Sequence, residues 1–238
     1  MPAPTRSAVR RSDSWRLGSR AEHEAAESGA FVADLVEGRA SASQYVAYLR
    51  RLRVVYAALE AALHEHREHP VVAAVDDPAL RRRAALEADL RHWTGCGPGP
   101  EALASPAATA YRARIERAAR TPYLLAAHHY TRYLGDLSGG QILARAVRSG
   151  FPGRSLNRGG LDFYRFEQIA APVPWKRAYR ERLDALPLDG GQDAVVLEEV
   201  RAAFRLNHAL LAEVAEVAAP RAGDSDQPDQ PHQPDQPD

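Results

Sequence analysis

Hydrophobic side chains recur at helical spacing along most of this chain. From Tyr45 to Leu63 they follow the i, i+3, i+4, i+7 pattern of one helix face, and the pattern returns from Leu80 to Trp93. No segment alternates apolar and polar residues with enough β-branched side chains to predict a strand. The spacing therefore predicts an all-α fold. We expect helices over 43–63, 78–93, 107–120, 122–149, 161–170, 174–186 and 191–218, with a further one carrying residues 16–27.

Breaks between these segments are short and do not resemble interdomain linkers. Asp77-Pro78 is typical of an N-cap followed by the first helical residue, and the sequence GCGPGP at 95–100 ends the helix that follows. We find no internal repeat, so a single domain over 13–218 is the simplest interpretation. The ends, 1–12 and 219–238, are predicted to be disordered, because the tail is a Gln/Pro/Asp repeat without apolar residues. His232 is expected to be a solvated residue of that tail, with weak metal binding as the alternative.

Composition narrows the cellular setting. The chain has 238 residues, of which 45% are hydrophobic, enough for a sizeable core. It carries 31 basic and 31 acidic residues, and this balance argues against a nucleic-acid or membrane partner. The single cysteine, Cys96, cannot form an internal disulfide. No secretory signal and no membrane anchor is evident, so a cytoplasmic protein is expected.

The segment YTRYLGDLSGGQ, residues 130–141, is the first candidate for chemistry. Gly135, Gly139 and Gly140 fall within six positions of a predicted helix. Each glycine in a helix interior costs about 0.5–1 kcal/mol relative to alanine. Such a loss is offset if the helix must bend, or must expose bare backbone to a flat ligand. Asp136 and Ser138 lie between the glycines, so the segment predicts a cofactor floor with polar groups aimed at the ligand.

A second candidate lies near the N-terminus. His23 and Glu27 are four residues apart and share a helix face, so the carboxylate can orient the imidazole as it does in metal-bound histidines. Arg16 and Arg20 precede them by one and two turns and suit anionic groups. From these residues alone, a solvated histidine on a surface helix remains the alternative.

A third candidate is the pair Lys176 and Arg180. The two residues present two cations on one helix face, which suits a clamp for carboxylates or phosphates. A solvated charged face is the alternative.

The remaining histidines are weaker candidates. His64, His66 and His69 suggest a metal, but His64 and His66 point in different directions on a helix, and solvation at the helix end is the alternative. At most one of the neighbours His128 and His129 can face a cofactor, and a structural role is favoured for both. No phosphate loop, Rossmann fingerprint or nucleophile elbow is present, so hydrolase and nucleotide functions have no support.

Four segments together resemble the heme oxygenase family. YTRYLGDLSGGQ is similar to its signature, and AEHEAAE (21–27) to its proximal-histidine helix. RRAALEADLRHW (82–93) and FRLNHALLAEV (204–214) resemble an intermediate helix and the last one. The matches occur in order over about residues 13–218, and the polar C-terminal end favours the soluble bacterial type.

The resemblance implies that heme b, both cofactor and substrate, lies between a proximal and a distal helix. His23 is then the iron ligand, oriented by Glu27, and the three glycines let the distal helix kink over the porphyrin. Residues expected to contact the heme propionates or the ring are Arg16, Arg20, Tyr130, Ser138, Lys176, Arg180 and Phe204. His128 is the alternative iron ligand.

Asp136 is expected to order a distal water network. The other members implied by the resemblance are Tyr56, Tyr111, Arg132 and Asn207. The implied reaction opens heme, at the α-meso carbon, to biliverdin, CO and ferrous iron, using O2 and electrons from a reductase or ferredoxin. Arg177 and Arg182 are candidates for the docking surface of that partner, and a monomer is expected.

Two other functions remain open at this point. A heme-storage or transfer protein would need His23 and the cations, yet it gives no reason for Asp136 beside its network. A helical bundle that binds no heme is the third hypothesis. Gly18 is unusual inside a helix, and Arg16 and Arg20 replace the lysines of the animal enzymes. The biliverdin isomer is therefore less determined than the class of reaction.

Overall fold

The computed structural model describes residues 9–97 and 104–217. Throughout these ranges the regular elements are helical, which confirms the all-α fold class. Helix α1 begins at Arg11, inside the segment 1–12 that was expected to be disordered. Residues 1–8 and the tail 219–238 lie outside the described residues. The helices are α1 (Arg11–Gly18), α2 (Arg20–Glu27), α3 (Ala30–Val36), α4 (Ala42–Glu65), α5 (Pro70–Val75), α6 (Arg83–Thr94), α7 (Pro106–Ala119), α8 (Leu125–His129), α9 (Gly135–Gly150), α10 (Pro172–Asp184) and α11 (Gly190–Ala215).

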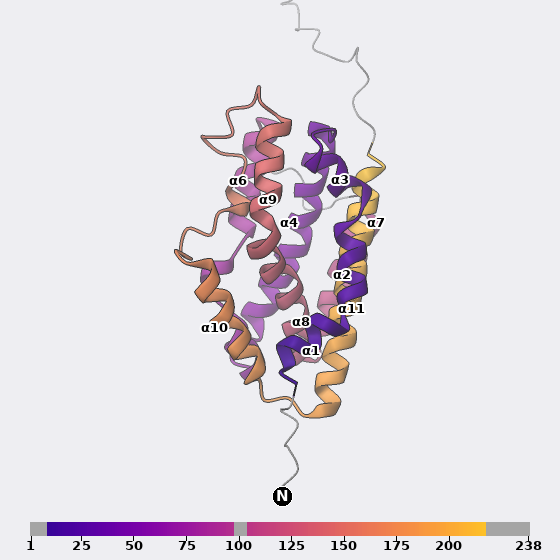
Figure 1. Ribbon diagram of the computed structural model, residues 1–238, viewed down its shortest axis with the longest axis vertical. Coiled ribbons are helices and arrows are strands. Elements are labelled where there is room, and N and C mark those ends of the chain that lie inside the picture. The colour runs from indigo at the N-terminus through magenta and orange to yellow at the C-terminus, as the bar shows by residue number, and fades with distance from the viewer. Residues whose placement is uncertain (1–8, 98–103, 218–238) are drawn as a thin grey trace, which may run out of the picture.

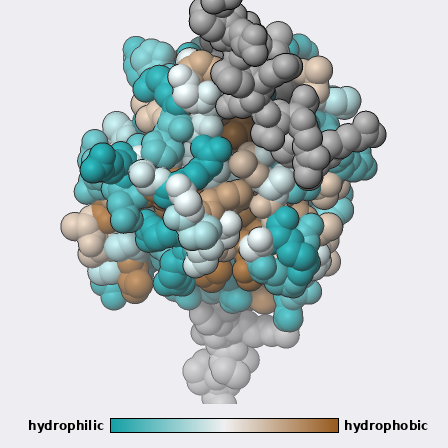
Figure 2. Space-filling view, turned by 90° about the horizontal axis from the view of Figure 1, so that it is seen from above, coloured by the Kyte–Doolittle hydropathy of each residue, from teal (hydrophilic) through white to brown (hydrophobic). Residues whose placement is uncertain are grey.

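Helix α4 forms the centre of the molecule. Its N-terminus is closed by a capping box between Ser41 and Gln44, and the helix packs against α6 and α7. Helix α11 begins with a second capping box, Asp189 with Gln192, and packs against α2, α7 and α8. In Figure 1, α4 and α9 lie between α10 on one side and α2 and α11 on the other. Seen from above, hydrophilic residues surround a smaller group of hydrophobic ones (Figure 2).

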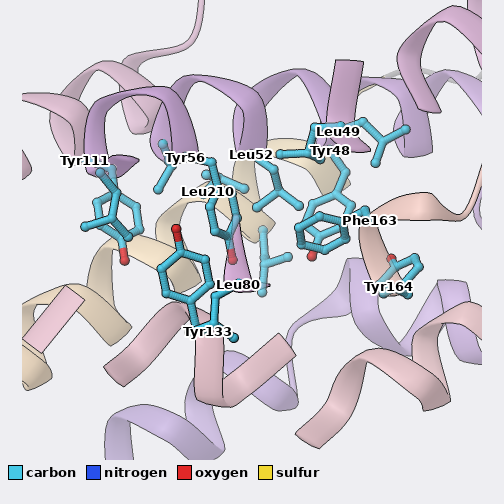
Figure 3. Close-up of a cluster of buried hydrophobic side chains, with 14 of the residues drawn as sticks. Tyr48, Leu49, Leu52, Tyr56, Leu80, Tyr111, Tyr133, Phe163, Tyr164 and Leu210 are labelled. Atoms are coloured by element: carbon cyan, nitrogen blue, oxygen red, sulfur yellow. The ribbon is translucent and has the colours of Figure 1, made fainter. Parts of the chain in front are cut away.

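The apolar face predicted for α4 does line the core. Leu49, Leu52, Tyr56 and Leu63 are all fully buried. They pack in one cluster with side chains from α6, α7 and the segment around Phe163, and Figure 3 shows several of these rings meeting. A second cluster joins α1, α8, α10 and α11. The two clusters hold α4 and α11 at fixed positions, and these two helices support the walls of the site described below.

The N-terminal helix expected around residues 16–27 is two helices. Helix α1 ends at Gly18, where a side chain's Cβ would lie 2.8 Å from Leu197 Cδ2. The carbonyl of Gly18 accepts a hydrogen bond from Arg201 Nε at 2.7 Å, and Ser19 Oγ donates to the Trp15 carbonyl at 2.7 Å. The unusual glycine is therefore explained by the close approach of α11.

The helix start expected at Asp77-Pro78 is wrong by five residues. Asp77 does cap a helical turn, accepting from the Ala79 amide at 3.0 Å, but this turn is the short 3₁₀ segment η1 (Pro78–Leu80). Helix α6 begins at Arg83, where Glu60 of α4 accepts from the backbone amides of Arg82 and Arg83. A residue from another helix supplies this cap, so local sequence could not reveal it.

The helix expected at 161–170 is also wrong, because only the 3₁₀ turn η4 (Asp162–Tyr164) forms there. The carboxylate of Asp89, which is fully buried, accepts from the amides of Asp162 and Phe163 at 2.8 Å each. Buried Arg82 donates to the carbonyls of Phe163 and Arg165. The side chains of Asp89 in α6 and of Arg82, the N-cap residue of α6, thus satisfy backbone groups that a helix would have paired internally.

The glycine-interrupted helix has an irregular middle. After the 3₁₀ turn η2 (Pro122–Leu124), α8 passes into η3 (Tyr130–Leu134), one π-helical turn, and α9 starts at Gly135. π-helical turns are a recognised cause of helix bending and occur often at functional sites. The kink itself stays a prediction. The change of register falls immediately before the glycines, whereas the sequence analysis placed the irregularity at the glycines themselves.

Candidate functional site: a cleft between α2 and α9

A cleft separates α2 from the glycine-rich start of α9. It consists of two adjoining cavities of about 400 Å³ and about 250 Å³. The residues that line both cavities come from α2, η3, α9 and α11: His23, Glu27, Thr131, Gly135, Ser138 and Phe204. Segments that are far apart in the sequence therefore meet here, and most of the predicted site residues line this cleft.

His23 lies on the α2 wall with its ring held on one side. Its Nδ1 is 3.3 Å from Glu27 Oε2, and its side chain is 47% exposed. The Phe204 ring meets the imidazole edge to face, with centroids 5.3 Å apart and planes at 78°. A carboxylate beside Nδ1 favours the tautomer protonated at Nδ1, and in that tautomer Nε2 carries the lone pair that can bind a metal. The predicted pairing of His23 with Glu27 is present.

The opposite wall is bare backbone. A Cβ built on Gly135 or Gly139 would have no atom within 4 Å, whereas one on Gly140 would lie 3.2 Å from Tyr164 Cδ1. Two of the three glycines therefore open the backbone toward the cleft, and the third makes room for a core side chain. A flat ligand can reach this wall at backbone distance, and His23 faces it from α2.

Cations gather at one end of the cleft. Arg16, Arg20 and Arg180 line the larger cavity together with Tyr130. Burial raises the pKa of Tyr130, and the charges of Arg180 and Arg16 oppose that rise, so both guanidinium groups act on its hydroxyl. Two of these cations have acidic partners, since Arg20 Nε lies 2.6 Å from Glu24 and Arg16 lies 3.4 Å from Asp13.

Lys176 reaches the cleft through Ser138. Its Nζ donates to Ser138 Oγ at 3.4 Å, which joins α10 to α9 beside the bare wall.

At the other end of the cleft, Arg132 connects a buried polar network. Its guanidinium donates to Asn207 Oδ1, to the Tyr56 hydroxyl at 3.4 Å and to Asp136 Oδ1 at 3.3 Å. The Tyr56 hydroxyl in turn donates to the Asp136 carboxylate. Four of the five predicted network members are thus hydrogen-bonded to one another, with groups from α4, η3, α9 and α11.

Burial raises the pKa of Asp136 well above its ordinary value. Its side chain is 11% exposed and lines the smaller cavity. The hydrogen bonds from Arg132 and Tyr56 act in the opposite direction, because they favour the ionised carboxylate.

Tyr111 is placed differently from the other predicted members. It is fully buried, and its hydroxyl has no hydrogen-bond partner among the described residues. Burial raises its pKa to about 12, with the charge of Arg132 acting in the opposite direction. Tyr111 therefore lies within electrostatic range of the network, and its ring packs on His128 with centroids 5.7 Å apart.

The sequence analysis missed two polar residues of the cleft. Tyr48 lines the smaller cavity, and burial raises its pKa to about 12. It lies two turns before Tyr56 on α4, so its helix face could have identified it, but it was assigned to the apolar core. Thr131 lines both cavities, and its buried hydroxyl has no hydrogen-bond partner in the described part of the chain. The apolar side chains of Leu17, Val36 and Ile142 are more than half exposed and also line the cleft.

Other candidate residues lie away from the cleft. His128 and His129 are completely buried and bond to Glu199 and Tyr179, so neither lines the two cavities. His69 Nδ1 accepts from the Val71 amide at the start of α5.

The two arginines considered for partner docking differ in exposure. Arg177 has an 80% exposed side chain. Arg182 instead packs over the rings of Trp175 and Tyr179.

The fold and the cleft together define a helical heme-binding protein. The heme oxygenase family model matches residues 10–213. Heme oxygenase 1 of Nostoc sp. is 37% identical over 84% of this chain and 83% of its own length. Human heme oxygenase 1 is 35% identical over 85% of this chain and 71% of its own.

Solved structures agree with these sequence matches. The heme oxygenase of Leptospira interrogans superimposes with a TM-score of 0.81 at 33% identity, covering 86% of this chain and 100% of that one. Heme oxygenase-1 of Synechocystis sp. in complex with heme also gives 0.81 at 34% identity, covering 87% and 92%. The chain belongs to the heme oxygenase family. Its function is the oxidative cleavage of heme to biliverdin, and heme is at once its substrate and its cofactor.

The residues present fit that substrate. A nitrogen ligand, a bare opposing wall, apolar lining and cations at one end match an iron, a flat ring and two carboxylates. Among the described residues, no helix is long and apolar enough to cross a membrane.

Proposed function

We propose that this protein opens heme at the α-meso carbon, with His23 as iron ligand and Asp136 as the decisive polar group of the opposite wall. The observation that supports this best is the hydrogen-bonded set formed by Arg132, Tyr56, Asp136 and Asn207 beside Gly139. A protein that only stored heme would gain nothing from burying a carboxyl group next to the ligand, because burying it without a function costs stability.

Bound heme supplies the iron at which O2 is reduced and the ring carbon that is oxidised. The protein positions that chemistry. Glu27 lies against the His23 imidazole at Nδ1, which orients the ring and leaves Nε2 to bind the iron. Gly135 and Gly139 carry no side chain, so the ring can lie directly against their backbone. No bulky side chain then occupies the space above the ring, and O2 can enter it.

Asp136 moves a proton in this scheme. Arg132 and Tyr56 donate to the two oxygens of the Asp136 carboxyl group and fix its orientation. A water molecule held by this group would carry a proton into the space above the ring. Asn207 and Arg132 keep the network rigid, and Tyr111, which is neutral, contributes through packing.

The cations set the rotation of the ring. Arg16, Arg20 and Arg180, with Tyr130, gather at one end of the cleft, and Lys176 is held there by Ser138. Two carboxylates bound at this end leave one edge of the ring facing Asp136. We propose that this edge carries the α-meso carbon.

Electrons must reach the heme from outside, since the reaction consumes reducing equivalents. We propose a reductase or ferredoxin that docks beside α10, where Arg177 is exposed. We also propose a monomer located in the cytoplasm, whose catalytic domain begins with α1 at Arg11.

Product analysis tests the proposal. Purified protein is incubated with heme, O2 and ascorbate or a ferredoxin system, and the pigment is separated from its isomers by chromatography. We expect α-biliverdin and CO from the wild type, and loss of biliverdin from Asp136→Ala with heme binding retained. The matched control is Asp34→Ala, which removes an exposed carboxylate paired with Arg39 outside the cleft. Full biliverdin yield from Asp136→Ala would contradict the assigned role, and stable heme without turnover in the wild type would favour a storage protein.

A further inference from the structure

A tyrosine–histidine pair is buried behind the distal wall. His129 Nδ1 lies 2.7 Å from the Tyr179 hydroxyl, and both side chains are fully buried. Their rings stack with centroids 5.5 Å apart and planes at 20°. Burial and the charges of Arg81 and Arg182 lower the pKa of His129 to about 3, so the imidazole is neutral, and in its Nε2–H tautomer Nδ1 accepts the phenol's hydrogen bond.

A tryptophan continues the stack toward the surface. Trp175 lies parallel to Tyr179, with centroids 5.2 Å apart and planes at 12°. Its indole Nε1 donates to Asp77 Oδ2 at 3.1 Å, and the ring is partly exposed. Each of the two oxidisable rings thus has its own hydrogen-bonded base, His129 for the phenol and Asp77 for the indole.

Further ring contacts connect His129 to the cleft. His129 contacts Tyr133 with ring centroids 4.6 Å apart, and Tyr133 contacts Tyr56 at 5.5 Å. The Tyr56 hydroxyl is bonded to Asp136 in the distal network. An unbroken series of ring contacts therefore runs from the place where oxygen is activated to Trp175 on α10.

We propose that Tyr179 and Trp175 form a one-electron oxidation site. It removes oxidising equivalents from the cleft when the reaction of O2 with heme is not completed. Its link to the cleft depends on the proposed function of the distal network. Tyr179 gives one electron to the oxidised heme, and its phenolic proton moves to His129 Nδ1, leaving a neutral phenoxyl radical and an imidazolium.

Trp175 then returns the electron to Tyr179. The proton goes back from His129 to the phenol oxygen, and the indole proton of Trp175 passes to Asp77. A reductant in solution, a thiol or ascorbate, gives one electron to Trp175 and releases its own proton to water, and Asp77 returns the proton it received to the indole nitrogen. Tyr133 and His129 act as the bridge between rings and are not themselves oxidised.

A hydrogen-bonded base distinguishes Tyr179 from several other buried tyrosines, whereas Tyr56 shares this feature through Asp136. The hydroxyls of Tyr45, Tyr111 and Tyr164 have no hydrogen-bond partner among the described residues. Oxidising a phenol that cannot release its proton leaves a buried positive charge, which is strongly unfavourable. Even a histidine whose pKa is about 3 accepts that proton, because an oxidised phenol is a very strong acid.

Photochemical oxidation of the full-length, heme-free protein tests the pair directly. A photogenerated ruthenium(III) polypyridyl complex oxidises exposed side chains, and electron paramagnetic resonance with ring-deuterated tyrosine separates tyrosyl from tryptophanyl radicals. We expect a tyrosyl signal in the wild type, its loss in Tyr179→Phe with the tryptophanyl signal retained, and loss of both signals in Trp175→Phe. The matched control, Tyr164→Phe, should keep the wild-type signal, and circular dichroism checks that each variant is folded.

An unchanged tyrosyl signal in Tyr179→Phe would overturn the assignment of the pair. This result would not affect the proposed function, because no heme is present in that experiment. A second experiment loads the protein with heme and adds hydrogen peroxide. The same tyrosyl signal, lost in Tyr179→Phe, supports the route from the cleft. Its absence there, when the photochemical signal is present, would overturn that route.

Discussion

Replacing Gly139 by alanine separates the stability of the distal helix from its function. A Cβ at this position meets no atom within 4 Å and projects into open space beside the cleft. Gly140, one residue later, is the matched control, because its Cβ would lie 3.2 Å from Cδ1 of the fully buried Tyr164. The two variants add the same methyl group to the same helix.

The expected magnitudes follow from that difference. Glycine to alanine in a helix interior stabilises the folded state by about 0.5–1 kcal/mol. This gain is common to both variants, so the difference between their free energies of unfolding reports the contact with Tyr164. Overpacking a core side chain costs about 1–3 kcal/mol. Gly139→Ala should raise the melting temperature by about 1–4 °C, and Gly140→Ala should lie below it by the overpacking cost.

Although Gly139→Ala should stabilise the fold, it should weaken heme binding. The new methyl group stands where the flat ring must approach the backbone, and a similar overpacking cost of about 1–3 kcal/mol weakens binding about 5- to 150-fold. Thermal unfolding of the heme-free variants gives the stabilities, and titration of the Soret band gives the affinities. If Gly139→Ala binds heme as tightly as the wild type, or is less stable than Gly140→Ala, the role assigned to the bare wall is wrong.

Three further changes have defined outcomes. His23→Ala should abolish turnover but retain some heme, because the cations remain; normal biliverdin yield without added imidazole would refute this. Glu199, held by hydrogen bonds from His128 and Arg114 that outweigh its burial, has its pKa lowered from 4.5 to about 2. Because the pKa of Glu199 is lower in the folded than in the unfolded state, its ionised form stabilises the fold. Glu199→Gln should therefore lower the free energy of unfolding by about 3 kcal/mol above pH 4.5, and this loss should shrink as the pH falls toward 2. Urea unfolding at pH 7 and pH 4 checks this. Asp89→Asn should destabilise the protein, because its side chain cannot accept from both amides of the η4 turn, and hydrogen exchange of those amides should accelerate.

Local pattern was sufficient for the long helices. The apolar spacing of α4 and α11 predicted their extent to within a few residues, since each has one continuous buried face and a capping box at its start. Prediction failed where a partner distant in sequence completes the backbone. Glu60 caps α6, and Asp89 with Arg82 holds the η4 turn, so neither boundary carries a local signal.

The site shows the same division. The signature around Asp136 and the pairing of His23 with Glu27 could be inferred from the sequence, because both depend on residues within one helical segment. That Arg132 bonds Asn207 and Tyr56, and that Tyr111 lies apart from those bonds, depends on how α4, η3 and α11 pack. Tyr48 was assigned to the core because a buried tyrosine and a cleft tyrosine have the same helical spacing.

The sequence by itself determined the all-α class and the identity of the chemical groups, since residue types and helical periodicity are local properties of the chain. Tertiary structure alone decided which of the glycines that line the cleft has room for a side chain. A Cβ at Gly135 or Gly139 would meet open space, whereas one at Gly140 would meet Tyr164, and this distinction depends on where α9 lies relative to its neighbours. Tertiary structure also brought His129 onto Tyr179, 50 residues away. Such contacts arise from helix packing, which no short segment of sequence can specify.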